Sequence, residues 1–535
     1  MQTMSPWADT IYRQKYAQDG ESWSDTANRV VDAVSTPHFP QYTHILKNAI
    51  AERKFIPGGR YLAQAGKSMK QYNNCVLFRA EDSREGWADL MHKVTLSSMT
   101  GAGVGVVYSD LRENGAPIKG NGGESSGPIA LMQMVNEAGR FIKAGGSRRA
   151  AIWAGLHWNH PDVFDFITLK DWNEAIVEAK SKDFNAAAPM DGTNISVILD
   201  DDFFEAYEDE TNDMHEWANK VYWSTVEHML TTAEPGFSID CGENRYENLR
   251  NACTEVTSAD DADICNLGSL NLAQIDTRDE FKDIVEAATA FLLAGSIESS
   301  VPHPKITATR IKNRRLGLGL MGVYEWLVKR GYTYDPNVEL DSWLREYAMS
   351  THIAGQLADS IGISRPVKTR AIAPAGTISI LAETTSGMEP LYAAAYKRRY
   401  LKNGVWHYQY VVDATAQRLI DQGIDPKSLE TAYELAKTPE RRIAMQAHLQ
   451  KFVDHAISST LNLPAVEEQS FTHEEFGNML MNYLPDLRGI TAYPDGARGG
   501  QPLNVVPIEE AYGVEGVEFE EFGSEKACVS GVCGI

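Results

Sequence analysis

The stretch that decides the fold of this chain reads Asn251-Ala252-Cys253-Thr254-Glu255 and continues, a few residues later, as Asp263-Ile264-Cys265-Asn266-Leu267-Gly268-Ser269-Leu270-Asn271-Leu272. In an extended loop, residues two apart project on the same side. We therefore expect Asn251, Cys253 and Glu255 to converge. They combine an amide that can orient a substrate, a sulfur that can react and a carboxylate that can move protons. Taken alone, this short pattern favours a plainer interpretation, in which Cys253 is a buried apolar thiol.

The other cysteines suggest redox chemistry. The six cysteines of the chain are Cys75, Cys241, Cys253, Cys265, Cys528 and Cys533. They are too few for a disulfide scaffold in so long a chain, which favours free, metal-bound or catalytic thiols. Cys528 and Cys533 lie in an acidic, glycine-containing tail that begins near Gly513, and such a tail is expected to be mobile. A cysteine pair there can exchange disulfides with partners, whereas a metal site would need further ligands that the tail lacks. We expect Cys241 to be structural.

Composition narrows the class of protein. The chain has 535 residues, 43% of them hydrophobic and 23% charged, which is typical of a globular protein. Its formal net charge of −23 argues against a nucleic-acid binder, which needs a basic face, but allows a small phosphorylated substrate. No apolar run reaches the roughly 18 residues of a membrane span, and the first residues do not resemble a signal peptide. We expect a soluble, cytoplasmic protein.

Hydrophobic periodicity predicts an α/β architecture that is mostly one large domain. Helical spacing occurs in Ser22–Val34, Tyr42–Lys54, His407–Ile420 and Glu430–His455. Strand-like runs occur at Val104–Tyr108, Ser196–Leu199 and Ala371–Ala373. Between about residues 57 and 395 such runs alternate with helical stretches.

Several blocks, in order along the chain, resemble ribonucleotide reductases. The stretch around Cys253 and Cys265 is similar to the family's finger loop and following strand. Further blocks are Phe55–Arg60, Tyr72–Cys75, Asn313–Gly322, Pro374–Ser379 and His455–Pro464. The likeness extends from about residue 50 to the C-terminus. It implies a ten-stranded α/β barrel of the ribonucleotide reductase and glycyl-radical type, built from two five-stranded halves with the finger loop at its centre. The division expected is an N-terminal helical segment over 1–55, the barrel over 56–510 and a redox-active tail over 511–535.

The resemblance also implies roles for single residues. Cys253 would be the thiyl radical that removes the 3′ hydrogen of the ribose, Glu255 the base at the 3′ hydroxyl, and Asn251 a substrate ligand. Cys75 and Cys265 would be the dithiol that reduces the 2′ carbon. Cys528 and Cys533 would re-reduce the resulting disulfide and be reset by a thioredoxin-like protein. Further substrate-binding residues would be Asn74 and the phosphate-binding turn Pro374, Ala375, Gly376, Thr377, Ile378 and Ser379. Without the family context, a plain Ser/Thr turn that caps a helix is the favoured interpretation of these residues.

The radical source follows from which class of the family the chain resembles. The oxygen-dependent class uses a Tyr-Tyr pair near the C-terminus, and this chain has no adjacent tyrosines. The anaerobic class carries a glycyl radical in an Arg-Val-x-Gly-aromatic context, which the ending Gly531–Ile535 lacks. Ala492–Leu503 is similar to members of the adenosylcobalamin class, so we expect that cofactor and no protein-bound metal. The alternatives are the large subunit of an oxygen-dependent enzyme and an inactive nucleotide-binding relative.

Two glycine-containing stretches occupy the places of the family's specificity loops. They are Gly120–Ser126 and the segment with Lys143, Ser147, Arg148 and Arg149. Glycines give such loops freedom, and the arginines can bind a base or phosphate of a deoxynucleotide or ATP effector. A basic surface loop is the alternative. The resemblance further implies a ribonucleoside di- or triphosphate substrate, an oxidoreductase activity that supplies deoxyribonucleotides for DNA synthesis, and a homodimer.

Overall fold

The structure is a computed structural model of the whole chain. It describes residues 4–73, 75–120, 122–144, 148–182, 186–402, 405–495, 497, 503–511, 513–514 and 517–520. No helix in these ranges is both long and apolar enough to cross a membrane.

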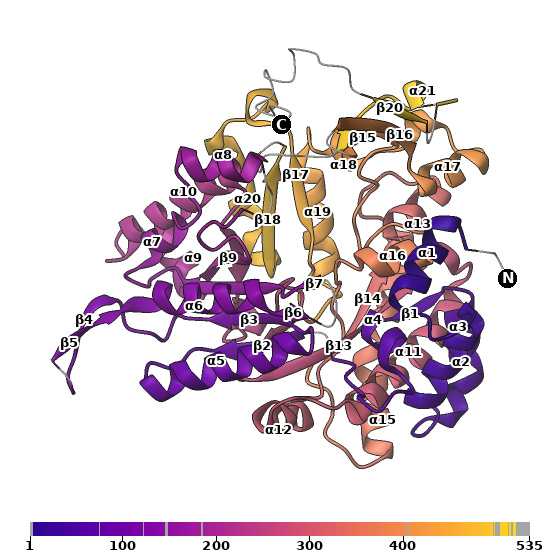
Figure 1. Cartoon of the computed structure of the whole chain (residues 1–535), viewed down its shortest axis with the longest axis horizontal. Coiled ribbons are helices and arrows are strands. Elements are labelled where there is room, and N and C mark those ends of the chain that lie inside the picture. The colour runs from indigo at the N-terminus through magenta and orange to yellow at the C-terminus, as the bar shows by residue number, and fades with distance from the viewer. Residues whose placement is uncertain are drawn as a thin grey trace.

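Helices open the chain, as the periodicity predicts. They are α1 (Pro6–Lys15), α2 (Trp23–Val34) and α3 (Thr43–Ala51). Helix α2 starts at a capping box in which Ser22 and Asp25 satisfy each other's backbone N–H groups. Its valines, Val30, Val31 and Val34, are fully buried in a core that also takes in the long helix α11 (Arg278–Glu298). These indigo helices cover one side of the molecule beside α11 (Figure 1).

One half of the central barrel is a regular parallel sheet. Its strands, in spatial order, are β2 (Cys75–Arg79), β3 (Gly103–Val107), β8 (Ile152–His157), β9 (Thr193–Leu199) and β10 (Gly236–Ile239). They are rich in valine, isoleucine and leucine, because a parallel sheet in a barrel is buried on both faces. Strands β3 and β9 confirm the predicted strands at 104–108 and 196–199. We call these five strands the first half.

The second half contains shorter pairings. Strand β13 (Asp263–Asn271) runs parallel to β14 (Leu316–Met321), and β17 (Thr460–Leu463) runs parallel to β18 (Gly489–Pro494). Two single bridges, Leu318 to Arg370 and Ile372 to Ile457, join β14 through segment 369–373 to segment 454–458, which leads into β17.

Antiparallel pairs connect the halves. Strand β13 pairs with β2, and β18 pairs with β10. Segment 454–458 and β17 count as one member, so each half has five members and the ring closes. The expected ten-stranded α/β barrel is confirmed. Strand β1 (Phe55–Pro57) adds to β13 outside the ring.

Two helix predictions in the C-terminal part need correction. His407–Ile420 is not one helix, because residues up to 412 belong to strand β16 (Val405–Val412), paired with β15 (Ala395–Lys402), and only α17 (Ala414–Asp421) is helical. The run alternates β-branched and aromatic residues with polar ones, which suits a strand. The stretch Glu430–His455 is interrupted before Pro439 and yields α18 (Ala432–Leu435) and α19 (Pro439–Gln450).

The remaining elements surround the barrel or connect its strands. Helices are α4 (Gly59–Gln64), α5 (Arg84–Met99), α6 (Gly127–Phe141), α7 (Val163–Ile167), α8 (Glu174–Lys182), α9 (Asp201–Glu208), α10 (His215–Thr232), α12 (Pro304–Asn313), α13 (Val323–Lys329), α14 (Val338–Ala348), α15 (Ser350–Ser360), α16 (Gly376–Ala382), α20 (His473–Tyr483) and α21 (Ile508–Ala511). Strands are β4 (Asn114–Ile118), β5 (Gly123–Ser126), β6 (Lys143–Ala144), β7 (Arg148–Arg149), β11 (Leu249–Arg250), β12 (Thr257–Ser258), β19 (Leu503–Val505) and β20 (Glu518–Glu520). The hairpin β4–β5 projects away from the other elements (Figure 1).

Candidate active site

The predicted finger loop joins β11 to β12, and it is a turn rather than an extended segment. The N–H of Thr254 donates to the carbonyl of Asn251 at 3.0 Å, and Thr254 has a φ of 68°. Asn251 and Glu255 are each 1% exposed, whereas Cys253 is exposed at the tip of the turn. The three side chains therefore do not project from one side of a strand, because the chain reverses direction inside the barrel.

Both halves of the barrel hold this loop. On the first half, Gly105 lies so close that a Cβ there would be 1.7 Å from the carbonyl oxygen of Arg250. The Arg250 guanidinium also donates to the carbonyl of Ile239 in β10 at 2.7 Å. On the second half, the N–H of Ala456 donates to the carbonyl of Glu255 at 2.9 Å. The loop is thus fixed in the interior by contacts to opposite walls.

Three of the predicted site residues meet below the turn. The Asn251 amide donates to Sγ of Cys75 at 3.0 Å, and that thiol lies 3.7 Å from Oε1 of Glu255. The other end of the Asn251 amide accepts from the N–H of Val256 at 3.0 Å, which fixes its orientation. An amide, a thiol and a carboxylate therefore form one contiguous buried group.

Cys75 and Cys265 are direct cross-strand partners. They occupy the same register position of the antiparallel pair β2–β13, and both are free buried thiols in one apolar cluster. Directly opposite residues have Cβ atoms about 4.5–5.5 Å apart, and a disulfide needs about 3.5–4.5 Å. A small local movement is therefore enough to join them.

Burial sets the protonation of this group. Burial raises the pKa of Cys75 well above its ordinary value, and the neighbouring Glu255 carboxylate raises it further. The pKa of Cys265 is raised in the same way. Burial also raises the pKa of Glu255, whose Oε2 has no hydrogen-bond partner among the described residues. The site thus holds two protonated thiols beside a carboxyl whose pKa has moved toward neutrality, as general acid–base chemistry requires.

The predicted phosphate-binding turn directly follows residues that pack in the same cluster as Cys75 and Cys265. Ala371 and Ala373 share the apolar cluster of Cys75 and Cys265, and the turn follows at Pro374. Ala375 has a φ of 52°, and α16 starts at the next residue. Pro374 and Gly376 are exposed, Ala375, Thr377 and Ile378 are half-buried, and Ser379 is buried with its hydroxyl donating to the carbonyl of Gly376 at 3.0 Å. The turn thus opens outward from the thiol pair.

Some predicted site residues cannot be placed with this group. Asn74, Ser147, Cys528 and Cys533 lie outside the described residues. Lys143, Arg148 and Arg149 belong to the short hairpin β6–β7, of which only the backbone is described. Cys241 is buried, and its thiol lies 3.7 Å from the carbonyl oxygen of Pro485, as suits a structural residue.

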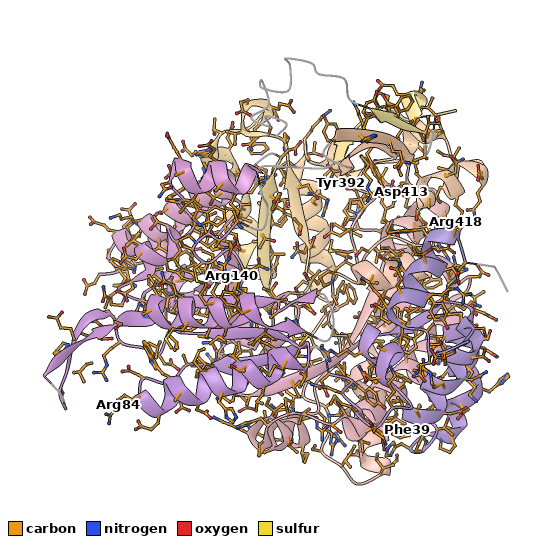
Figure 2. The ribbon with its side chains drawn as sticks, viewed as in Figure 1. Phe39, Arg84, Arg140, Tyr392, Asp413 and Arg418 are labelled. Carbon is orange, nitrogen blue, oxygen red and sulfur yellow. The ribbon has the colours of Figure 1, made fainter. Side chains whose placement is uncertain are left out.

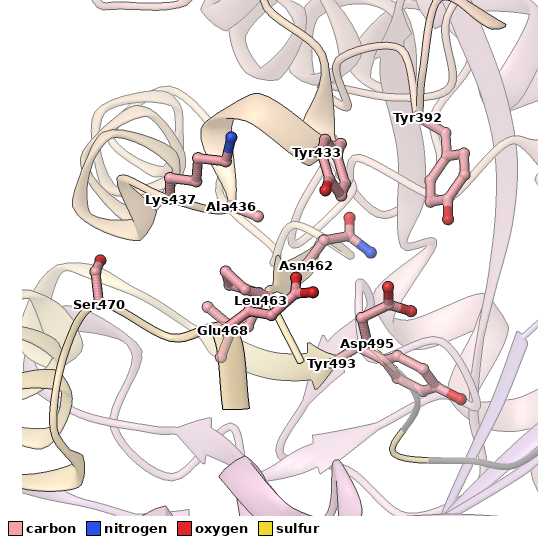
Figure 3. Close-up of a pocket in the computed structure, with 11 residues that line it drawn as sticks. Tyr392, Tyr433, Ala436, Lys437, Asn462, Leu463, Glu468, Ser470, Tyr493 and Asp495 are labelled. Atoms are coloured by element: carbon pink, nitrogen blue, oxygen red, sulfur yellow. The ribbon is translucent and has the colours of Figure 1, made fainter. Parts of the chain in front are cut away.

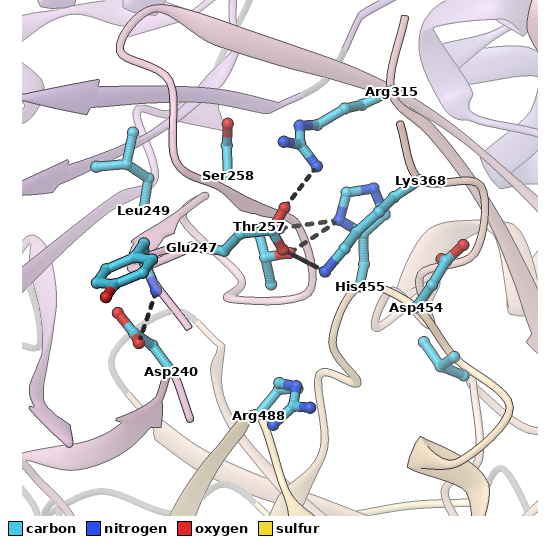
Figure 4. A network of polar contacts seen from close by, with 12 residues as sticks. Asp240, Glu247, Leu249, Thr257, Ser258, Arg315, Lys368, Asp454, His455 and Arg488 are labelled. Carbon is cyan, nitrogen blue, oxygen red and sulfur yellow. Dashed lines mark hydrogen bonds and ion pairs between the residues drawn. The ribbon is translucent and has the colours of Figure 1, made fainter. Parts of the chain in front are cut away.

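The sequence reasoning missed a buried polar cluster beneath the loop. Thr257 lies between Glu247 and His455, and its hydroxyl donates to Glu247 at 2.9 Å (Figure 4). Arg315 and Lys368 form ion pairs with the same Glu247 carboxylate. Burial lowers the pKa of Lys368 to about 8 although Glu247 opposes the shift. No local pattern reveals this cluster, because its members come from distant parts of the chain.

A cavity opens at the carboxyl ends of β17 and β18. It has a volume of about 200 Å³ and is lined by Tyr392, Tyr433, Tyr493, Asn462 and Asp495, among others (Figure 3). Tyr392 also lies near the upper end of α19 in the wider view (Figure 2). Burial raises the pKa of Tyr392, and the Asp495 carboxylate adds to the rise. The cavity combines aromatic faces with polar groups that can accept hydrogen bonds.

One surface cluster has metal-ligand chemistry but unfavourable surroundings. Ligand atoms of Asp89, His92 and His303 lie within 4.8 Å of one another. However, Lys93 forms an ion pair with Asp89 at 3.0 Å, and Nδ1 of His303 accepts from the N–H of Lys305 as a helix cap. That bond places the ring proton on Nε2, which leaves His303 no lone pair for a metal.

Known proteins are similar to this chain over most of its length. A relative from Mycobacterium tuberculosis, a vitamin B12-dependent ribonucleoside-diphosphate reductase, is 26% identical over 97% of this chain and 82% of its own length. A protein of the same description from Thermoplasma acidophilum is 26% identical over 95% of this chain and 72% of its own. A putative adenosylcobalamin-dependent ribonucleoside-triphosphate reductase of Mycobacterium phage D29 is 26% identical over 89% of this chain and 78% of its own. The family model described as "Ribonucleotide reductase, barrel domain" matches residues 73–248, 217–349 and 364–493. The chain belongs to the ribonucleotide reductase family.

Proposed function

We propose that this protein reduces ribonucleotides to 2′-deoxyribonucleotides by thiyl-radical chemistry that adenosylcobalamin initiates. The observation that carries the proposal is the pairing of Cys75 with Cys265 across β2 and β13, beside Glu255 and beneath the turn that bears Cys253. The descriptions of the three relatives, each vitamin B12- or adenosylcobalamin-dependent, support this cofactor over the oxygen-dependent alternative.

Each loop residue has one task in this reaction. Cys253, the exposed thiol of the turn, removes the 3′ hydrogen of the ribose once its sulfur has lost a hydrogen atom. Glu255 takes the proton of the 3′ hydroxyl, for which a carboxyl of raised pKa is suited. Asn251, oriented by its bond from Val256, holds the sugar against these groups.

The thiol pair supplies the two electrons. Cys75 and Cys265 give two hydrogen atoms, the C2′–O bond breaks, the oxygen leaves as water and C2′ receives hydrogen. The sulfurs end joined as a disulfide, which their shared register position allows. Reduction of that buried disulfide requires an accessible dithiol. Cys528 and Cys533 of the tail fill this role, and a thioredoxin-like protein resets them.

The residues of the cavity beside β17 and β18 fit part of the cofactor. Tyr392, Tyr433 and Tyr493 present flat faces for stacking a purine, and Asn462 and Asp495 can accept from its exocyclic amine. These residues would hold the nucleoside portion of adenosylcobalamin. The chemistry that this cofactor supplies when bound is homolytic cleavage of its cobalt–carbon bond, which starts the radical reaction at a thiol.

We also propose which partners the protein binds and how the chain is organised. The substrate is a ribonucleoside di- or triphosphate whose phosphates lie at the turn Pro374–Ser379, with Asn74 as a further ligand. Deoxynucleotide or ATP effectors bind near Lys143, Ser147, Arg148 and Arg149 in a cytoplasmic homodimer. The chain divides into a helical segment (1–55), the barrel (56–510) and the tail (511–535).

One assay decides between the proposed function and its alternatives. The purified chain is incubated with adenosylcobalamin, a small dithiol and ribonucleotides, with no second subunit, and deoxyribonucleotide formation is measured. We expect turnover that Cys253→Ser abolishes. Inactivity of the wild-type chain would exclude the cobalamin mechanism. Nucleotide binding without turnover would instead indicate an inactive relative.

A further inference from the structure

His455 opens a block that resembles the family, yet no step of the proposed function uses it. It lies in segment 454–458, one of the members that close the barrel. Its N–H donates to the carbonyl of Arg370 at 3.0 Å, and its carbonyl accepts from the Gln450 amide at 2.9 Å. The side chain is 0% exposed. The imidazole is therefore held at a fixed place inside the second half.

The imidazole contacts the catalytic loop two residues beyond Glu255. Nδ1 of His455 accepts from the N–H of Thr257 at 3.1 Å. The next residue, Ala456, donates its N–H to the carbonyl of Glu255 at 2.9 Å. Two successive residues, His455 and Ala456, thus form hydrogen bonds with the chain that follows the turn, at Thr257 and Glu255. We call this pair of hydrogen bonds the loop clamp.

The surroundings keep the imidazole neutral with its proton on Nε2. Because Nδ1 accepts from a backbone N–H, it cannot carry the ring proton. Burial lowers the pKa of His455 well below its ordinary value, and nearby cations lower it further. The charged groups facing this region are Arg250 of β11, Arg315 before β14, Lys368 and Arg370 of the neighbouring segment, and the carboxylates Glu247 and Asp454. A protonated Nδ1 could no longer accept from the Thr257 N–H.

Packing alone does not account for a histidine here. Nε2 is buried and has no hydrogen-bond partner among the described residues. An unpaired buried donor is unfavourable, and leucine would fill similar space without one. The cost of the unpaired Nε2 is offset by the hydrogen bond at Nδ1. If Nδ1 were absent, the buried N–H of Thr257 would lose its acceptor. The acceptor on Nδ1 is therefore the chemical reason for histidine at this position.

We propose that His455 is a positioning residue for ribonucleotide reduction. Its imidazole places the Glu255 carboxyl by accepting a hydrogen bond from the N–H of Thr257. This inference rests on the proposed function for the role of Glu255. It does not make His455 a catalytic residue, since the imidazole acts through the loop.

Two amide substitutions separate the two ring nitrogens. In His455→Asn the side-chain oxygen can take the place of Nδ1, whereas in His455→Gln the amide reaches the place of Nε2. His455→Leu removes both. We expect kcat to fall roughly ten- to hundredfold in the Leu and Gln variants, as for loss of one buried acceptor. The Asn variant should retain kcat within about threefold.

Three readouts distinguish positioning from simple destabilisation. The nucleotide dissociation constant, measured by equilibrium dialysis without cofactor, should stay unchanged in all variants. Hydrogen exchange of the Thr257 amide should accelerate in the Leu and Gln variants only. The acid limb of the kcat–pH profile should move to lower pH in these two variants, because a loosened loop admits water to Glu255 and its pKa returns toward the ordinary value.

His160 provides a matched control on the first half. It is also buried, and its Nδ1 accepts from the N–H of Asp162 at 3.0 Å, far along the chain from the loop. His160→Leu should lower the melting temperature and leave the acid limb in place. Rescue of kcat by Gln rather than Asn, or an unshifted acid limb in His455→Leu, would overturn the proposal. If the Leu variant does not fold, the comparison of Asn with Gln decides. An inactive wild-type chain would refute the proposed function, whereas the exchange rate of the Thr257 amide still tests the clamp.

Discussion

The two halves of the barrel are built in different ways. The first half is a continuous parallel ladder, in which β3, β8 and β9 are hydrogen-bonded along their lengths. The second half closes through the single bridges at Arg370 and Ile372, and polar side chains supply further hydrogen bonds between its segments. The Asp454 carboxylate accepts from the N–H groups of Thr369 at 3.0 Å and of Arg370 at 2.7 Å. Where the ladder is short, the Asp454 side chain replaces part of it, and the next two residues, His455 and Ala456, form hydrogen bonds with the chain around Glu255.

This contrast assigns different tasks to the halves. The first half approaches the loop with backbone at Gly105, which leaves no room for a side chain, and its Ile239 carbonyl accepts from the Arg250 guanidinium just before the loop. The second half binds the loop with directed hydrogen bonds from Ala456 and to His455. The first half therefore limits where the loop can lie, and the second half fixes the position of the residues that follow the turn.

The largest effect is expected from removal of either thiol of the pair, because one comes from each half. Cys75→Ser and Cys265→Ser should each abolish multiple turnovers with a small dithiol, since two electrons require both sulfurs. Deoxyribonucleotide yield per chain measures this. Cys241→Ser, which changes a buried thiol outside the site, should remain active. Sustained turnover by only one of the two serine variants would contradict the equal contribution of the halves.

The next largest effect should come from the first-half wall. In Gly105→Ala the added Cβ meets the carbonyl carbon and oxygen of Arg250, so the loop must shift. We expect kcat to fall roughly a hundredfold or more and unfolding to become easier by about 1–3 kcal/mol. Gly355→Ala is the control, because a Cβ there makes only ordinary contact within helix α15. Wild-type kcat in Gly105→Ala would show that this wall does not limit the loop.

A smaller effect, on stability, should come from the second half. Asp454→Ala leaves the N–H groups of Thr369 and Arg370 without their carboxylate acceptor. We expect a loss of about 1.5–3 kcal/mol in the free energy of unfolding, measured with urea. Asp359→Ala removes only an exposed ion pair to Arg365 and should leave the free energy of unfolding almost unchanged. Equal losses in the two variants would mean that Asp454 does not replace the missing ladder.

The smallest predicted change is a displacement of the pH profile. Glu255 must be deprotonated to accept the proton of the 3′ hydroxyl, and burial raises its pKa. Activity should therefore fall on acidification at a higher pH than for an ordinary glutamate, and approach a plateau as pH rises above the raised pKa. The kcat–pH profile measures this. Glu255→Gln should remove the acid limb together with the activity.

Local sequence predicted some elements better than others. Strands at 104–108 and 196–199 were foreseeable because buried parallel strands are continuous apolar runs. The run His407–Ile420 misled, because its aromatic and apolar residues fit helical spacing although residues up to 412 pair with β15. Pairing across a hairpin is a contact between segments, and a single window of sequence does not contain it.

The sequence by itself determined the candidates for the reactive groups. Cys75, Cys253 and Cys265, together with Asn251 and Glu255, lie in short motifs that can be compared with a family. Only the tertiary structure decided how these groups meet. Strand register places Cys75 opposite Cys265. Hydrogen bonds from Ala456 to Glu255 and from Thr257 to His455 fix the position of Glu255. The physical reason is that a motif records covalent neighbours. Burial, register and hydrogen-bond partners arise from residues that folding brings together from distant parts of the chain.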